Sequence, residues 1–182
     1  MLDAWPVVEY YDGNDPSASE VDRLLSGKTI DAVMCSVNFA EVYSAMASNA
    51  RDFNVAMRFV ESLKQIVTIE EPSAEVAKLA ALLKHCYHMS LGDSFAAATA
   101  ISRSSGLWLS NAPLASEGQP AEYVPLWTGD SELLSDDRVW EVHDLRSAER
   151  KTQHETDIAT GRKKAGRRAG TEKGWSILTH PI

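Results

Sequence analysis

Hydrophobic positions recur along the chain in two patterns, one of helical spacing and one of short continuous runs. Apolar residues three or four positions apart, with polar residues between them, predict amphipathic helices. The helices predicted in this way cover residues 4–11, 17–27, 36–48, 52–65, 73–88 and 90–106. Short apolar or β-branched runs bounded by turn residues predict buried strands. Those runs cover residues 30–35, 66–69, 107–109, 123–127 and 139–142.

The alternation of strands and helices predicts an α/β fold with a parallel sheet joined by right-handed crossovers. The alternating pattern ends near residue 146, so residues 1–146 are expected to form one domain. Within it, residues 110–121 are rich in Ser, Ala, Pro and Gly and are expected to be an inserted loop. Residues 147–182 are basic, and most of them lack an apolar stripe. We expect this C-terminal tail to be disordered.

Four carboxylates, those of Asp3, Glu41, Asp93 and Asp130, lie where an apolar run gives way to a helix or a turn. Open α/β sheets form their sites at the carboxyl ends of the strands, so these acids are expected to share one crevice. Carboxylates held together repel one another unless a cation joins them. Oxygen ligands suit Mg²⁺ or Mn²⁺. The pattern therefore predicts a metal-dependent nuclease that cleaves phosphodiester bonds.

Composition narrows the class of protein. The chain has 182 residues, of which 44% are hydrophobic, so it can bury an ordinary core. No apolar run approaches the roughly 18 residues of a membrane helix, and the N-terminus lacks the basic region of a secretory signal. Two cysteines, Cys35 and Cys86, are too few for a disulfide framework. We expect a cytoplasmic protein with no membrane partner.

The net charge of −8 is unevenly distributed along the chain. Residues 147–182 carry eight Lys or Arg and four Asp or Glu, whereas residues 1–146 carry ten basic and 22 acidic residues, a net charge of −12. A body this acidic binds nucleic acid poorly by itself, because the phosphates are also negative. A nuclease of this composition needs metal ions, the basic tail or a basic partner to supply positive charge.

The acidic segments also carry a family resemblance. In order along the chain they read LDA at 2–4, SVNFAEV at 36–42, SLGDSFAAA at 90–98 and LWTGDSEL at 126–133, followed by WEVHDLR at 140–146. This series of motifs resembles the PIN-domain ribonucleases, in particular the VapC-type toxins of toxin–antitoxin pairs. The resemblance covers residues 1–146 and implies a three-layer sandwich, with a central, mostly parallel sheet between helices on both faces.

The resemblance also implies a site and partners. Asp3, Glu41, Asp93 and Asp130 would form the acidic pocket, and the activity would be cleavage of RNA with Mg²⁺ or Mn²⁺. The usual partner is a small antitoxin protein, and such toxins commonly form homodimers. We assign Asp3 and Asp93 as direct ligands of the ion, with Glu41 and Asp130 completing its shell or positioning water. The hydroxyl groups expected to hydrogen-bond these carboxylates are those of Ser36 and Thr128.

Two departures from the family pattern motivate an alternative function. Only two residues precede Asp3, whereas a buried strand usually has about five, and the gap from Asp93 to Asp130 is longer than expected by a dozen residues or more. Residues 106–111 and 124–130 both resemble the strand before the fourth acid, but only the second carries the acid. The alternative is a catalytically impaired PIN module that binds antitoxin or RNA without cleavage. A receiver-like phosphoacceptor domain is a third possibility, although the chain shows no convincing trio of paired acid, acceptor Asp and Lys.

Overall fold

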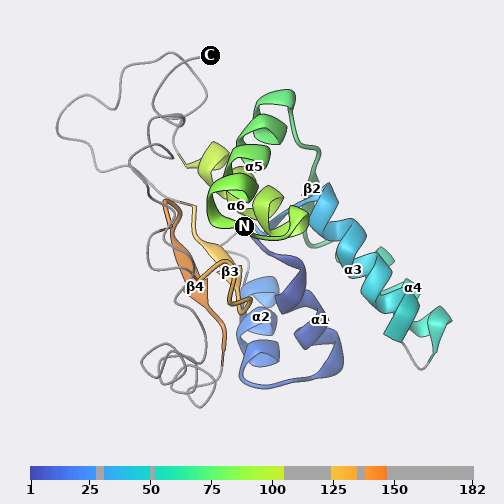
Figure 1. Cartoon of the computed structure of the whole chain (residues 1–182). Helices are drawn as coiled ribbons and strands as arrows, with labels where there is room; N and C mark the ends of the chain where they lie inside the picture. Colours follow the sequence, from blue (N-terminus) through green and yellow to red (C-terminus); the bar gives the residue numbers. More distant parts are fainter. Residues whose placement is uncertain (28–30, 50–51, 105–123, 135–137, 147–182) are drawn as a thin grey trace.

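Short strands and longer helices follow one another in the computed structural model of the chain, which describes residues 1–27, 31–49, 52–104, 124–134 and 138–146 (Figure 1). The helices are α1 (Ala4–Asp12), α2 (Ser17–Ser26), α3 (Ser36–Asn49), α4 (Phe53–Leu63), α5 (Ala74–Tyr87) and α6 (Leu91–Arg103). The strands are β1 (Val33–Cys35), β2 (Thr68–Glu70), β3 (Leu126–Thr128) and β4 (Val142–Asp144). The α/β fold class predicted from the sequence is therefore confirmed.

The element boundaries agree with the sequence pattern better for helices than for strands. Each predicted helix is present, whereas β1, β2, β3 and β4 all begin two or three residues later than the runs predicted for them. Pairing between neighbouring strands decides where a strand lies, and hydrophobicity alone does not contain that information. The predicted strand at 107–109, the loop at 110–121 and the tail at 147–182 lie outside the described residues.

The first three residues join two pairs of strands into one sheet. Strand β1 pairs in parallel with β2, and β3 pairs in parallel with β4. Between these pairs, the Leu2 N–H donates to the Val33 carbonyl over 2.7 Å, and Leu2 also forms a parallel bridge with Trp127. The described order across the sheet is therefore β2, β1, residues 1–3, β3 and β4. Residues 1–3 thus occupy the central position of the sheet that the family resemblance implies.

Side chains that alternate along the strands face two separate cores. Met1, Val33 and Leu126 pack on the side that α5 and α6 cover, whereas Leu2 and Trp127 pack on the side of α1 to α4. Figure 1 shows α5 beside α6, and α1 beside α2. Successive residues of a strand point to opposite faces, so each central strand contributes to both cores. The result is the sandwich of helices, sheet and helices expected from the resemblance.

The start of α2 depends on a contact that is distant in the sequence. Ser17 and Glu20 have the spacing of a capping box, but the N-cap residue is Pro16 and Ser17 lies inside the helix. The Ser17 hydroxyl instead donates to the Leu145 carbonyl over 2.9 Å, a contact that ties α2 to the segment after β4. Asp15 instead provides an acceptor for the first turn of α2, because its Oδ1 accepts from the Ser19 N–H over 3.2 Å. A distant carbonyl therefore competes for the hydroxyl that local spacing assigned to the cap.

The cysteines are both free, and Cys35 is buried in the core between the sheet and α5 and α6. Across the described parts of the chain, none of the helices combines the length and apolarity that crossing a membrane requires.

Shortening the central side chain should weaken the whole sheet. We expect Leu2→Ala to lower the free energy of unfolding by about 2–5 kcal/mol, because Leu2 is only 1% exposed and the substitution leaves a cavity. Urea unfolding followed by circular dichroism measures the change. The matched control is Leu91→Ala, since Leu91 is 54% exposed and its loss should change stability by less than about 0.5 kcal/mol. Equal unfolding midpoints for the two variants would contradict a central role for Leu2.

Candidate active site

The four predicted acids come from four different places in the fold. Asp3 follows the central segment of the sheet, and Asp130 lies two residues beyond β3. Asp93 belongs to the first turn of α6, and Glu41 lies in the second turn of α3. Since α3 starts directly after β1, these positions lie toward the carboxyl ends of neighbouring parallel strands. This is the edge at which open α/β sheets form their sites.

Asp3 is the most enclosed of the four acids, with 2% of its surface exposed. Its Oδ1 accepts from the Ala4 N–H over 2.7 Å and from Asn38 Nδ2 over 3.2 Å, and its Oδ2 accepts from Thr128 Oγ1 over 2.8 Å. The contact with Thr128 is the one expected from the sequence. Burial raises the pKa of Asp3 from 3.8 to about 6, although the Thr128 and Ala4 hydrogen bonds oppose the rise. Asp3 also caps α1, so one side chain ends the central segment, starts a helix and enters the site.

The pKa of Asp93 is raised further than that of Asp3. It is 7% exposed, and burial, followed by the negative charge of Asp3, raises its pKa from 3.8 to about 8. The hydrogen bond with Ser90 opposes this rise, whereas the charge of Asp130 and a hydrogen bond with Glu132 add to it. A carboxyl group that is forced to hold its proton near neutral pH is typical of a functional site.

Glu41 is more exposed and lies against the start of α6. Its Oε2 accepts from Asn38 Nδ2 over 3.3 Å. Burial raises the pKa of Glu41, the Asn38 hydrogen bond lowers it, and the charge of Asp130 raises it. A Cβ atom on Gly92 would overlap the Glu41 carboxylate, so the glycine before Asp93 leaves the space that this carboxylate occupies.

Asp130 is placed by a turn after β3. Its N–H donates to Thr128 Oγ1 over 3.0 Å, and its Oδ1 accepts from the Glu132 N–H over 2.8 Å. The negative charge of Asp130 raises the pKa values of Asp3, Glu41 and Asp93. Asp130 therefore shapes the turn after β3 and also contributes its charge to the acidic cluster.

These contacts bring the four acids into one region of mutual repulsion. Hydrogen bonds through Asn38 and Thr128 link Asp3 to Glu41 and to the turn of Asp130, and charge interactions link Asp93 to Asp3 and Asp130. No three His, Cys, Asp or Glu side chains among the described residues stand close enough to hold a metal ion in this conformation. The four acids nevertheless offer only oxygen atoms as ligands, and such a set suits a hard divalent cation such as Mg²⁺ or Mn²⁺.

Two residues of the site were not assigned a role from the sequence. Asn38 lies within the motif that ends in Glu41, and its buried amide contacts two of the acids. Glu132 follows Asp130, and its Oε2 accepts from the Ser90 N–H over 2.8 Å at the start of α6. Conversely, Ser36 donates to Glu71 over 2.9 Å, so its expected bond to the site carboxylates is wrong. The spacing of a motif does not reveal which neighbouring strand a hydroxyl faces.

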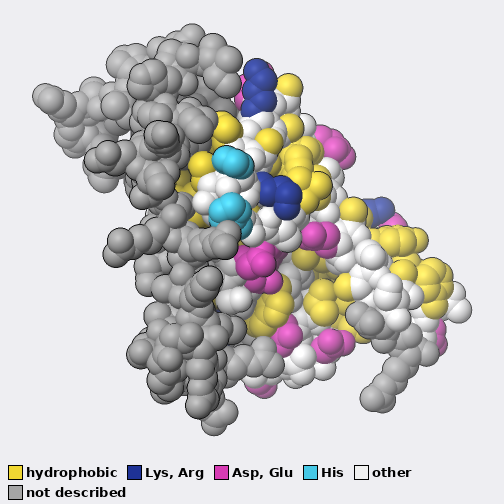
Figure 2. Space-filling model, viewed as in Figure 1, with side chains coloured by type: hydrophobic (Ala, Val, Ile, Leu, Met, Phe, Trp, Pro, Cys, Tyr) yellow, Lys and Arg dark blue, Asp and Glu magenta, His cyan; other side chains and the backbone are white. Residues whose placement is uncertain are grey.

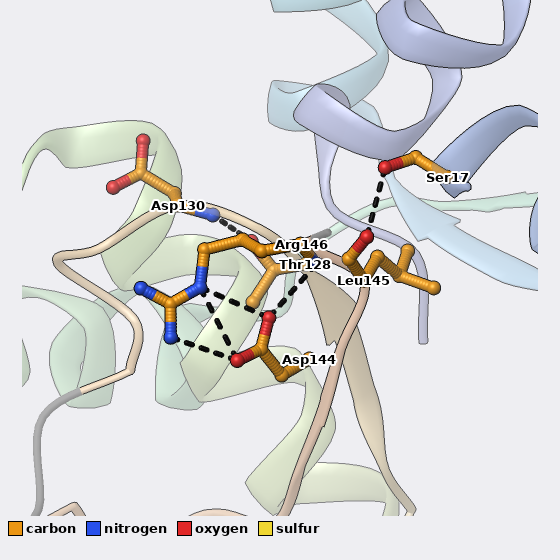
Figure 3. A network of polar contacts seen from close by, with 6 residues as sticks. All are labelled: Ser17, Thr128, Asp130, Asp144, Leu145 and Arg146. Carbon is orange, nitrogen blue, oxygen red and sulfur yellow. Dashed lines mark hydrogen bonds and ion pairs between the residues drawn. The ribbon is translucent and has the colours of Figure 1, made fainter. Parts of the chain in front are cut away.

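The neighbouring strand end carries an ion pair (Figure 3). Thr128 is in register with Asp144 of β4, and the Leu145 N–H donates to the Thr128 carbonyl over 2.9 Å. Arg146 donates hydrogen bonds to the Asp144 carboxylate through Nε and Nη2, and the distance from Nη2 to Oδ2 is 2.8 Å. Figure 2 shows acidic side chains gathered near the middle of the described surface, below the histidines. The Arg146 guanidinium is thus paired with Asp144, which is not one of the four predicted acids.

Comparison with known proteins finds a matching family model and a solved structure with a similar fold. A family model described as PIN domain matches residues 1–110, a range that contains Asp3, Glu41 and Asp93 and ends before Asp130. The 2.2 Å structure of VapBC-1 from nontypeable Haemophilus influenzae superposes with a TM-score of 0.53 at 18% identity, covering 80% of this chain and 96% of that chain. At this identity the likeness establishes a shared fold. No curated protein matches the chain.

The raised pKa of Asp93 predicts a pH-dependent gain in stability for Asp93→Asn in EDTA. The folded state holds the Asp93 proton more tightly than the unfolded state does. The contribution of this proton to stability is therefore fully present below about pH 4 and is lost as the pH rises toward 8. The amide does not titrate, so its advantage over the wild type should grow by at least about 1 kcal/mol between pH 4.5 and pH 8. Urea unfolding at both pH values measures this difference.

The control is Val55→Ala, which changes an exposed side chain in α4 and removes no titrating group, so its effect on stability should be equal at the two pH values. A gain for Asp93→Asn that does not depend on pH would show that the carboxyl group is ionised without cost in the folded protein.

Proposed function

Because the chain belongs to the PIN-domain family, we propose that it is a metal-dependent endoribonuclease that acts as the toxin of a toxin–antitoxin pair. PIN domains are generally nucleases, and hydrogen bonds through Asn38 and Thr128 connect Asp3 with Glu41 and with the turn of Asp130 in this fold. The observation that carries the proposal is this hydrogen-bonded arrangement of carboxylates from different elements, in which the charge of Asp3 adds to the burial that raises the pKa of Asp93. Such an arrangement costs folding energy, and binding a divalent cation would repay it.

Each acid has a defined part in the proposed reaction. Asp3 and Asp93, the more buried pair, would be the direct ligands of Mg²⁺ or Mn²⁺, and Asp93 must release its proton before its oxygen atoms can take that role. Glu41 and Asp130, which are more exposed, would complete the ligand set or orient the attacking water. The bound ion supplies acidification of water and neutralisation of charge at the phosphate. Thr128 holds the Asp3 carboxylate in a fixed direction.

The acidic surface favours dependence on metal ions for RNA binding. Residues 1–146 carry a net charge of −12, so the phosphates of RNA meet repulsion over most of this segment. A divalent ion at the carboxylates would provide local positive charge where the scissile phosphate must lie. The eight Lys or Arg residues of the segment 147–182 could add a second, less specific attraction.

The alternative of a catalytically impaired module has lost one of its two motives. The short first segment pairs with a strand on either side, and its Asp3 lies in the acidic cluster. The other motive, the long stretch between Asp93 and Asp130, includes residues 105–123, which lie outside the described residues. We therefore favour an active nuclease and keep impaired catalysis as a defined outcome of the tests below.

The toxin role is supported by motif and fold together. The four motifs resemble VapC-type toxins, and the structure of VapBC-1 from Haemophilus influenzae shares the fold. We propose a small antitoxin protein as the natural partner and a homodimer as the assembly, with both proteins in the cytoplasm. An antitoxin that brings basic side chains to the acidic cluster would satisfy the same charges as the metal ion.

Purified protein should cleave RNA in Mn²⁺ or Mg²⁺ and should stop when EDTA is added. We expect Asp93→Asn to lower the cleavage rate by at least about 100-fold, because a lost ligand costs about 3 kcal/mol of transition-state stabilisation. Gel analysis of a labelled RNA measures the rate. Asp31→Asn, an exposed acid outside the site, should cleave at the wild-type rate. Cleavage that continues in EDTA would reject the metal-dependent mechanism.

Expression of the chain in a bacterial host should arrest growth if it is a toxin. Asp93→Asn should remove the arrest, and co-expression of a small protein encoded next to this chain should relieve it, because the antitoxin would block the carboxylates. Growth curves and RNA integrity report the two effects. Normal growth together with retained binding of the small protein would support the impaired module instead.

A further inference from the structure

The side chain of Asn38 occupies the point at which three elements of the site meet. It lies in the first turn of α3 and is fully buried. Its Nδ2 lies 3.2 Å from Asp3 Oδ1, 3.3 Å from Glu41 Oε2 and 3.1 Å from the Gly92 carbonyl oxygen. An amide nitrogen carries two hydrogen atoms, so three acceptors share two donors. Asn38 therefore links the central segment, α3 and the first turn of α6.

The other end of the amide shows what fixes its orientation. Asn38 Oδ1 is buried and has no hydrogen-bond partner among the described residues. A buried acceptor without a partner costs free energy, so the orientation of the Asn38 amide needs a physical reason. Rotation by half a turn would direct this oxygen at the carboxylates of Asp3 and Glu41. Repulsion from those two groups is the physical reason why the amide keeps its nitrogen toward them.

We propose that Asn38 is a positioning residue that holds the carboxylates of Asp3 and Glu41 at a fixed separation before a divalent cation binds. It acts through those two acids and through the Gly92 carbonyl next to Asp93, and it touches no reacting atom. This inference rests on the proposed function only for the identity of the cation. Its central claim, that a neutral donor offsets the repulsion between two acids, concerns the metal-free protein.

The alternative role for Asn38 is simple packing in the core of α3. The two roles differ in their response to an isosteric change. Asn38→Asp keeps the shape of the side chain but replaces the donor with a third negative charge beside Asp3 and Glu41. Asn38→Ala removes the donor and some volume but adds no charge. Packing predicts that the isosteric variant is the more stable of the two, whereas positioning by charge predicts the reverse order.

The experiment measures urea unfolding of the full chain in EDTA at pH 8 for the wild type and both variants. We expect the unfolding midpoint to fall from wild type to Asn38→Ala and to fall further for Asn38→Asp. This order needs neither metal nor RNA, so it tests the positioning role even if the chain is not a nuclease. An Asn38→Asp midpoint equal to or above that of Asn38→Ala would overturn the proposal.

A second measurement reports on preorganisation. Isothermal titration with Mn²⁺ alone should show that Asn38→Ala binds the ion at least about tenfold more weakly than the wild type does. A loss of this size is typical when a group that orients metal ligands is removed. The matched control is Val60→Ala, which removes buried volume in α4 at a position with 0% exposure. It should destabilise the fold and leave Mn²⁺ affinity within twofold of the wild type.

The two proposals fail in different ways. If the wild type binds no Mn²⁺, the metal-dependent nuclease is rejected, and the unfolding order in EDTA still decides the role of Asn38. If the wild type binds Mn²⁺ and Asn38→Ala binds it equally well, the nuclease proposal survives and the positioning role is rejected.

Discussion

The pairing of Leu2 with strands on both sides is the interaction on which the rest of the structure depends. Its N–H donates to Val33, and its neighbours exchange backbone hydrogen bonds with Trp127, so three residues join two separate pairs of strands. Asp3 comes immediately after this junction and therefore stands at the centre of the sheet's carboxyl edge. If the junction moved by one residue, Leu2 and Asp3 would exchange faces, and both the core and the site would be lost.

The site is a place where folding and function make opposing demands. The fold buries Asp3 and Asp93 beside each other, although burial and like charge both disfavour ionised carboxylates. Neutral donors reduce the cost in part, because the Thr128 hydroxyl and the Asn38 amide both donate to the Asp3 carboxylate. A group of acids held by neutral donors is ready to accept positive charge, whether it comes from a divalent ion or from a partner protein.

Much of the architecture could be predicted from local pattern. Helix α5 begins after Ser73 and α6 after Ser90, because each serine side chain accepts a hydrogen bond from the first turn. The motif around Asp93 predicted both a helix start and a site acid, since one short segment contains the cap and the carboxylate. The Ser17 hydroxyl, by contrast, donates to the carbonyl of Leu145, a residue so distant in the sequence that no local pattern indicates the contact. Local signals succeed where the interacting groups are within one helical turn.

The sequence by itself determined the helices, the α/β class, the family and the four candidate acids, because these follow from residue type and spacing along one chain. Only the tertiary structure decided that residues 1–3 lie between β1 and β3, that Ser36 bonds Glu71, and that Asn38 and Glu132 contact the candidate site. Those facts depend on which segments lie side by side. Spacing within a motif is a one-dimensional property, whereas a charge cluster and its donors are set by distances between segments that the motif does not contain.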